Sequence, residues 1–354
     1  MTAENRVALP TVTRAVTLRS YPDGEPKESD FAVREFALPE LAPGMILVQN
    51  EWFSLDPSMR IRMTAGESTY FAPYPLDEAL DGWAVGRVLA SAHDGFAAGE
   101  YVHHFGGWRE HAVVAAPDQD WYSPRRVEVG GGIDSRHHLG VLGPSGLTAW
   151  AGLFRVGRMQ PGETVFVSAA AGAVGTLVVQ MAKLKGASVV ASAGTDEKVR
   201  HLIEDLGADA AFNYRSAPVL DSLREAAPDG IDVYFDGVGG DHLDAALLQL
   251  RAGGRVALCG QIAGYNLQGD ERPGIKNLFS AIEKGLTLQG FLARMYFDDF
   301  DEFYREVSQW LARGQLVFDE TVIDGLEASP AGFIGMLRGT NIGKSLVRVR
   351  PRTS

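Results

Sequence analysis

The pattern of apolar and polar residues changes near residue 138. Before it, short runs of β-forming residues are separated by Gly and Pro; they lie at 11–18, 46–50, Trp83–Ala90, Glu100–His104 and His111–Ala115. This spacing predicts an antiparallel, barrel-like domain with few helices. The polar, glycine-rich stretch Arg125–His138 is the expected boundary.

Beyond the boundary, apolar runs alternate with amphipathic segments. Strands are expected at 164–168, Ser188–Ala193, Ala211–Tyr214, Ile231–Asp236, Arg255–Gly260 and Leu286–Leu292. Helices are expected at Gly146–Val156, from 173, at Asp196–Leu206, between Tyr214 and Ile231, at Asp241–Leu250 and at Phe300–Arg313. The alternation predicts an α/β fold with a doubly wound parallel sheet of the Rossmann type. The last strand, Leu346–Val349, is expected to return to the first domain, which gives bounds of 1–138, 139–310 and 311–354.

A glycine-rich loop separates the first strand of this second region from its helix. It reads Ala170-Ala171-Gly172-Ala173-Val174-Gly175, a variant of the dinucleotide fingerprint with Ala in place of the first Gly. Diphosphate oxygens need backbone N–H groups at close range and the positive end of a helix dipole, and a side chain at Gly172 would block that approach. The alternative is a small-residue turn without a ligand; the order strand, loop, helix favours dinucleotide binding.

The net charge argues against certain binding partners, and the cysteine content indicates the redox state of the compartment. The 354 residues include 33 basic and 45 acidic side chains, a net charge of −12, which argues against nucleic acid or an anionic membrane surface as a partner. No apolar run approaches the ~20 residues of a membrane span, and Met1–Arg14 has no apolar signal core. The single cysteine, Cys259, excludes an intrachain disulfide and a multi-cysteine zinc site, which fits a reducing, cytoplasmic compartment.

Familiar catalytic groups of other enzyme classes are missing from the sequence. The adjacent pairs His103-His104 and His137-His138 do not suit a shared metal ion, because neighbouring residues on a strand face opposite ways. There is no Gly-His-Glu zinc segment, no Tyr followed four residues later by Lys, and no Gly-x-Ser-x-Gly. No metal is therefore expected. Asp236 is predicted to be a capping or ion-pairing group, and Cys259 a small buried residue.

Several short motifs, in order, resemble the medium-chain dehydrogenase/reductase superfamily. They are Leu55-Asp56-Pro57 with Met59-Arg60, Gly86-Arg87-Val88, Gly107-Trp108, Gly146-Leu147-Thr148-Ala149, Ala169–Gly175, Phe235-Asp236 with Val238-Gly239-Gly240, Cys259-Gly260 with Tyr265-Asn266, and Asn341 with Gly343-Lys344. Within the superfamily the chain resembles the zinc-independent leukotriene B4 12-hydroxydehydrogenase/prostaglandin reductases and alkenal double-bond reductases. The resemblance implies a GroES-like barrel completed by the C-terminus, followed in chain order by a Rossmann domain. Ser58, Trp83, Pro144-Ser145 and Gly237 depart from the usual family residues.

The coenzyme implied by the resemblance is NADP(H). An NAD enzyme usually has an acidic residue after the second strand, and here Gly194-Thr195 ends that strand. Asp196, the next residue, is either the acid that bonds the ribose or, as an alternative to Thr195, the cap of the following helix. The family holds the 2′-phosphate with a Lys and a Tyr that correspond to Lys198 and Tyr214. The resemblance also places coenzyme contacts at Gly237, Val238, Cys259, Gly260, Phe291 and Asn341.

The expected reaction is reduction of an activated carbon–carbon double bond. Without zinc, conjugate reduction of an enone or enal needs the least help: hydride adds at the β-carbon, and the resulting enolate is stabilised and protonated. Tyr265 follows the fifth strand and corresponds to the family's substrate-contacting Tyr, so it is the candidate catalytic donor. A zinc-free quinone reductase and a non-catalytic NADPH-binding protein are the alternatives.

Two further features bear on partners. The stretch Thr64–Glu78 carries Tyr70, Phe71 and Tyr74, which either contact an apolar or aromatic acceptor or pack on their own domain. The apolar strand Leu286–Leu292 is expected at the edge of the sheet, where unpaired backbone groups favour a homodimer, the state known in the resembled family.

Overall fold

The chain divides into two compact units in the computed structural model, which describes residues 8–66, 71–116, 120–267, 271 and 274–350. The first unit comprises Met1–Leu139, Val322–Ile334 and Leu346–Ser354; the second comprises Gly140–Thr321 and Gly335–Ser345. Among the described residues, no helix combines the length and the apolar character needed to cross a bilayer.

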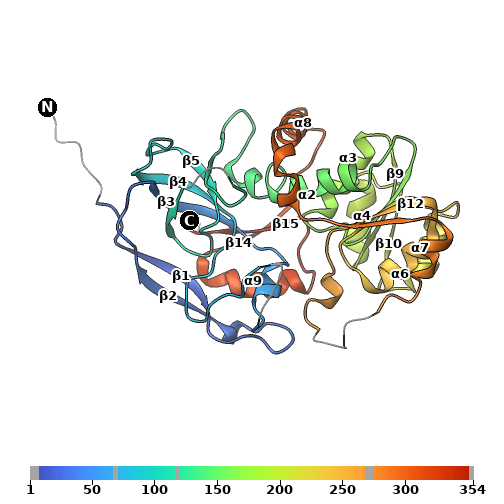
Figure 1. Ribbon diagram of the computed structural model, residues 1–354, viewed down its shortest axis with the longest axis horizontal. Coiled ribbons are helices and arrows are strands. Elements are labelled where there is room, and N and C mark those ends of the chain that lie inside the picture. The colour runs from blue at the N-terminus through green and yellow to red at the C-terminus, as the bar shows by residue number, and fades with distance from the viewer. Residues whose placement is uncertain (1–7, 67–70, 117–119, 268–270, 272–273, 351–354) are drawn as a thin grey trace. The chain divides into compact units, whose positions relative to one another are not determined.

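The first unit is built from antiparallel strands, as its short β-forming runs predict. A seven-stranded sheet has the order β14-β15-β3-β4-β5-β7, with β6 also paired to β3, and β1 pairs with β2 in a separate ribbon (Figure 1). The elements are β1 (Val12–Leu18), β2 (Phe31–Ala37), β3 (Met45–Ser54), α1 (Met59–Arg62), β4 (Ala84–Ser91), β5 (Tyr101–His104), β6 (His111–Ala115), β7 (Arg125–Arg126), β14 (Glu320–Asp324), α9 (Ser329–Leu337) and β15 (Lys344–Arg348).

Aromatic side chains pack the centre of the first unit. Trp108 is fully buried; its ring stacks on Phe31 and meets Phe53 and Phe333, with ring centroids 5.3–6.4 Å apart. Strands β3 and β4 pair antiparallel, and beside an irregularity in their register a Cβ on Gly86 would lie 2.1 Å from the Gln49 carbonyl oxygen. Only glycine fits that position.

The second unit is a six-stranded parallel sheet of order β10-β9-β8-β11-β12-β13 with helical connections (Figure 1). This strand order is the doubly wound Rossmann arrangement that the alternating pattern predicts. The strands are β8 (Thr164–Val167), β9 (Ser188–Ala193), β10 (Ala210–Asn213), β11 (Ile231–Asp236), β12 (Leu250–Leu258) and β13 (Thr287–Gly290). The helices are α2 (Pro144–Ala151), α3 (Gly175–Leu184), α4 (Asp196–Glu204), α5 (Val219–Ala226), α6 (Gly240–Gln249), α7 (Phe279–Glu283) and α8 (Phe300–Ala312).

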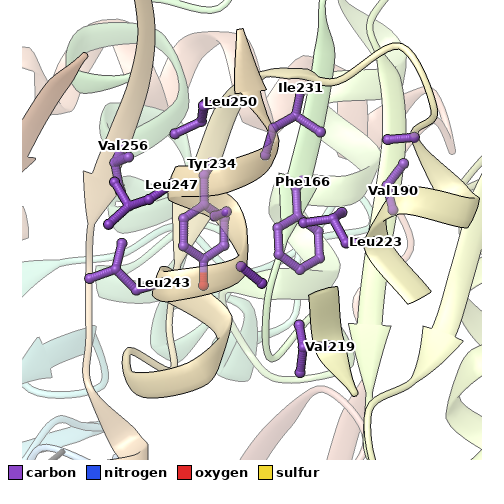
Figure 2. Close-up of a cluster of buried hydrophobic side chains, with 13 residues drawn as sticks. Phe166, Val190, Val219, Leu223, Ile231, Tyr234, Leu243, Leu247, Leu250 and Val256 are labelled. Atoms are coloured by element: carbon purple, nitrogen blue, oxygen red, sulfur yellow. The ribbon is translucent and has the colours of Figure 1, made fainter. Parts of the chain in front are cut away.

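One core of the second unit lies between the sheet and helices α5 and α6 (Figure 2). Phe166 of β8 and Tyr234 of β11 stack at its centre, with ring centroids 5.0 Å apart. Leu223 of α5 and Leu247 of α6 are fully buried against them. Complete burial of side chains this large contributes about 1.5–3 kcal/mol each, so this core fixes the strands whose ends form the candidate site.

The expected elements differ from the observed ones mainly at their ends. Strands β9 and β11 have the predicted bounds, whereas α3 begins at Gly175 rather than 173, because the preceding loop extends through Val174. Strand β12 begins at Leu250, since that residue pairs with Ile231 across an irregularity in the register. Strands β2, β7 and β14 and helices α1, α7 and α9 have no counterpart among the expected elements.

Candidate functional site

The glycine-rich loop forms a tight backbone cradle between β8 and α3. The Ala170 N–H donates to the Ser192 carbonyl at 3.1 Å, which ties the loop to the end of β9. A Cβ on Gly175 would lie 2.4 Å from the Ala169 carbonyl oxygen and 2.6 Å from the Ala170 Cα. A Cβ on Gly172 would lie 3.2 Å from the same carbonyl. The cradle therefore admits no side chain at Gly175, as the fingerprint predicts.

A carboxylate fixes the turn after β11. The Asp236 side chain accepts hydrogen bonds from the Gly239 N–H at 2.8 Å, the Val238 N–H at 3.0 Å and the Tyr234 hydroxyl at 2.7 Å. Burial raises the pKa of this carboxyl, while the hydrogen bonds from Gly239 and Tyr234 oppose the shift. The Gly237 N–H donates to the Ser168 hydroxyl at 3.0 Å. Asp236 thus orders the turn after β11 but does not cap α6, whose N-cap is Gly239 and has no side-chain partner. Ser168 links this turn to the end of β8.

Tyr265 lies in the turn after β12, as expected. The Cys259 and Gly260 N–H groups both donate to the Asp236 carbonyl, at 2.9 and 3.0 Å, so this turn lies directly beside the turn after β11. The Tyr265 hydroxyl accepts from the Gln261 N–H at 3.4 Å and lies 3.3 Å from where a Cβ on Gly260 would be. Burial raises the pKa of the Tyr265 phenol, which keeps it protonated and able to donate at neutral pH.

The Cys259 thiol is expected to be a poor nucleophile. Burial raises the pKa of its thiol to about 12, so the nucleophilic thiolate is absent at neutral pH. By solvent exposure Cys259 is partly buried, whereas the sequence predicted a buried residue.

A positively charged cluster lies at the end of β9. Thr195 is the cap of α4, since its side chain accepts from the Lys198 N–H at 3.3 Å, and the Asp196 carboxylate accepts from the Asn213 side chain at 2.8 Å. Lys198 extends from the first turn of α4, and burial together with the charge of Arg215 lowers the pKa of its ammonium.

Tyr214 and Arg215 complete this cluster. A Cβ on Gly194 would lie 3.0 Å from the Tyr214 hydroxyl and 3.4 Å from Arg215 Nε, so both side chains lie over the glycine. Arg215 was not among the residues predicted from the sequence. Its position next to Tyr214 was the only available signal, and the two cations come together only because β10 lies beside β9.

The returning segment 339–344 lies along the glycine-rich loop. Gly343 forms a bridge with Gly172, and its N–H donates to the Ala171 carbonyl at 2.9 Å. The Asn341 side chain donates to the Gly343 carbonyl at 2.8 Å. Asn341, 166 positions after Gly175 in the numbering, is therefore brought to the same edge of the loop.

Phe291 and the aromatic residues of the first unit have packing roles in this structure. Phe291 is buried and meets Phe235 edge to face, with centroids 6.2 Å apart. Tyr74 is buried beneath the Arg62 guanidinium, and Phe71 stacks on Phe105, so both pack on their own unit. Tyr70 lies outside the described residues.

In each histidine pair the two rings have different partners: His137 accepts from the Asp134 N–H at 3.1 Å, whereas His138 Nε2 lies 2.8 Å from the Glu128 carbonyl oxygen. His103 stacks on Trp83 at 4.7 Å, whereas His104 contacts the Asn50 side-chain oxygen at 2.9 Å, so the two rings point to different partners. Over the described ranges, no three His, Cys, Asp or Glu side chains are grouped so as to hold a metal ion.

Comparison with known proteins gives consistent relationships. Residues 14–120 match the model for the N-terminal domain of oxidoreductase, and residues 173–313 match the zinc-binding dehydrogenase model. The chain is 38% identical over 340 residues to 2-alkenal reductase (NADP(+)-dependent) of Nicotiana tabacum, covering 95% of this chain and 97% of the relative. It is 36% identical to NADPH-dependent curcumin reductase of Escherichia coli, over 95% and 96% of the two chains.

A solved structure with the same fold contains the coenzyme. CurA of Vibrio vulnificus in complex with NADPH superposes with a TM-score of 0.88 at 35% identity, covering 95% of this chain and 99% of the other. The fold, the full-length identities and the cradle agree with the resemblance found in the sequence. The chain belongs to the zinc-independent alkenal reductase family of the medium-chain dehydrogenase/reductase superfamily.

Proposed function

We propose that this protein uses NADPH to reduce the carbon–carbon double bond of α,β-unsaturated ketones or aldehydes. The observation that carries the proposal is the backbone cradle at Gly172 and Gly175, with Tyr265 at the adjoining strand ends. The curated relatives named above are NADP-dependent alkenal and curcumin reductases, which supports this substrate class.

The residues present fit NADP(H). The cradle of 170–175 offers N–H groups and the N-terminus of a ten-residue helix to a diphosphate. Lys198, Tyr214 and Arg215 supply two cations and a hydroxyl suited to the 2′-phosphate, and Thr195 uses its side chain as a helix cap instead of offering the acidic group typical of NAD enzymes. The remaining proposed contacts are Gly194, Gly237, Val238, Cys259, Gly260, Asn341 and the backbone around Phe291, whose ring is buried against Phe235. When bound, NADPH supplies the hydride.

Tyr265 is the proposed catalytic donor. Its phenol is protonated at neutral pH and can donate a hydrogen bond to the oxygen on which negative charge develops during conjugate reduction. The turn that carries it is held to Asp236 by two backbone hydrogen bonds, which orients the donor before reaction.

Product analysis with NADPH and an enone tests the reaction. We expect the saturated ketone or aldehyde, with the carbonyl intact; an allylic alcohol as the main product would contradict the proposal.

Tyr265→Phe should lower kcat about 10–100-fold, because one donor to the developing charge is lost while other donors and solvent remain. The conservative control is Tyr296→Phe, a partly buried tyrosine after β13, which should leave kcat within about twofold. An unchanged kcat in Tyr265→Phe would show that Tyr265 has no catalytic role, while the proposed reaction would still be tested by the product analysis.

We also propose that the chain forms a homodimer through the β13 edge. In the described part of the sheet, β13 pairs only with β12, and the neighbouring helix α7 exposes apolar side chains: Phe279 is 66% and Ile282 77% exposed. An exposed strand edge beside an apolar patch favours pairing with a second copy.

Sedimentation should give twice the 38.2 kDa chain mass at micromolar concentration. Ile282→Asp should shift the population to monomer, because it places a charge in the proposed contact. Val129→Asp, at another exposed apolar residue, is the matched control and should remain dimeric. A wild-type protein that sediments only as a monomer would contradict the dimer.

A cytoplasmic location is proposed because the chain has a single, free cysteine and therefore needs no oxidising compartment to form an intrachain disulfide.

A further inference from the structure

A histidine on α4 joins this helix to a segment distant in sequence. His201 Nε2 lies 2.9 Å from an Asp319 carboxylate oxygen, and its Nδ1 lies 2.7 Å from Asp205, one turn further along α4. The His201 and Asp319 side chains are 16% and 15% exposed, whereas Asp205 is 64% exposed. These two carboxylates are the charged groups that face the ring.

Asp319 is in turn bonded to the segment beside the glycine-rich loop. Its carbonyl accepts from the Lys344 N–H at 2.9 Å, and a Cβ on Gly343 would lie only 2.1 Å from that same oxygen. Gly343 has a φ of +65°, so glycine is needed there for both reasons. On its other side, Gly343 donates to Ala171 in the glycine-rich loop. Contacts therefore run without a break from His201 through Asp319 and Gly343 to the loop.

The segment has a second attachment to the same helix. Lys198, three residues before His201 and so on the same face of α4, donates from Nζ to the Gly339 carbonyl at 2.8 Å. Thr321 also binds Ile342, with its hydroxyl donating to the carbonyl at 2.9 Å and accepting from the N–H at 3.1 Å. The position of Asn341 and of the loop edge thus depends on how firmly α4 holds this segment.

We infer that His201 is a positioning residue for the coenzyme: by binding Asp319, it holds segment 339–344 against the glycine-rich loop. This rests on the proposed assignment of that loop to NADP(H). His201 acts on the backbone cradle, which is common to both coenzymes, and does not act on the 2′-phosphate. Its loss therefore weakens NADPH and NADH binding by the same factor.

The contact depends on the charge of the ring. Partial burial lowers the pKa of His201, but hydrogen bonds to Asp319 and Asp205 outweigh burial and raise it above its usual range. The doubly bonded form is complete below the ordinary histidine pKa of about 6.5 and is lost as pH rises through the raised value. Neutral imidazole has one N–H and so satisfies one carboxylate at a time.

Coenzyme titration, followed by nicotinamide fluorescence between pH 5.5 and 9 without substrate, tests the inference. His201→Gln should raise Kd about 5–10-fold at pH 6 for both NADPH and NADH, leave their ratio within about twofold, and flatten the fall in NADH affinity at high pH. NADH is the cleaner probe, because it lacks the 2′-phosphate that itself titrates near pH 6. Asp205→Asn should move the midpoint of the wild-type profile to lower pH, since it removes one of the two carboxylates that raise the pKa.

Glu204→Gln, which removes an exposed charge from the same helix, is the matched control and should leave both Kd values within about twofold. If His201→Gln does not fold, Asp319→Asn supplies the same comparison. Wild-type Kd values and a wild-type pH profile in the variant would overturn the inference. Because no substrate is present, a protein that binds coenzyme as described but reduces no enone would refute the proposed reaction and leave this inference standing.

Discussion

Gly175→Ala should raise the Kd for NADPH about 5–150-fold. The added Cβ would lie 2.4 Å from the Ala169 carbonyl oxygen and 2.6 Å from the Ala170 Cα, and both are backbone atoms. Neither can move as a flexible side chain would, so the loop itself must shift, and an overpacked site of this kind typically costs about 1–3 kcal/mol or more. The shift displaces the N–H groups offered to the diphosphate, so the variant should lose affinity for NADPH as well as stability of the fold.

Isothermal titration with NADPH measures the effect, and a thermal unfolding scan of the same sample verifies that the variant is folded. Gly290→Ala is the matched control: it lies in the same sheet, a Cβ there meets nothing within 4 Å, and it should leave the Kd within about twofold. Wild-type affinity in a folded Gly175→Ala would show that the cradle does not receive the diphosphate.

The sequence predicted the parallel sheet well because its strands are short, apolar and bounded by small residues. Strands β9 and β11 agree to the residue with the expected ranges, since in each all residues but one are buried and the strand ends in a turn. Strand β2 was missed because it carries Arg34 and Glu35 in its middle and is largely exposed, so its pattern is weakly apolar. Its strand conformation comes from pairing with β1, which only the fold supplies.

In the candidate site, too, some residues could be located from the sequence, and others only from the structure. The loop residues and Tyr265 could be located from local sequence, because strand, small-residue turn and helix follow one another directly. The His201–Asp319 contact joins residues 118 positions apart, and no periodicity along the chain links them. Arg215 was adjacent to a predicted residue, yet its approach to Lys198 depends on the pairing of β9 with β10. Long-range contacts that support a local motif are thus the part that required the structure.

The charge at position 198 should set the preference for NADPH over NADH. Lys198 lies in the first turn of α4 beside Tyr214 and Arg215, and its three N–H donors allow it to bind a phosphate while keeping the contact to the Gly339 carbonyl. Lys198→Glu removes a charge-assisted hydrogen bond and adds repulsion, so NADPH binding should weaken by about 1.5–3 kcal/mol, or roughly 10–150-fold in Kd.

NADH, which lacks the 2′-phosphate, separates this direct role from a general effect on the site. The Kd for NADH should change by less than about threefold in Lys198→Glu. The preference for NADPH, given by the Kd for NADH divided by the Kd for NADPH, therefore falls by at least about threefold. Arg200→Glu makes the same change of charge on the exposed side of the same helix and should leave the ratio within about twofold, because solvent screens an exposed charge. Equal weakening of NADPH and NADH in Lys198→Glu would mean that Lys198 acts only by holding Gly339, in the manner inferred for His201. An unchanged Kd for both coenzymes would place the 2′-phosphate elsewhere.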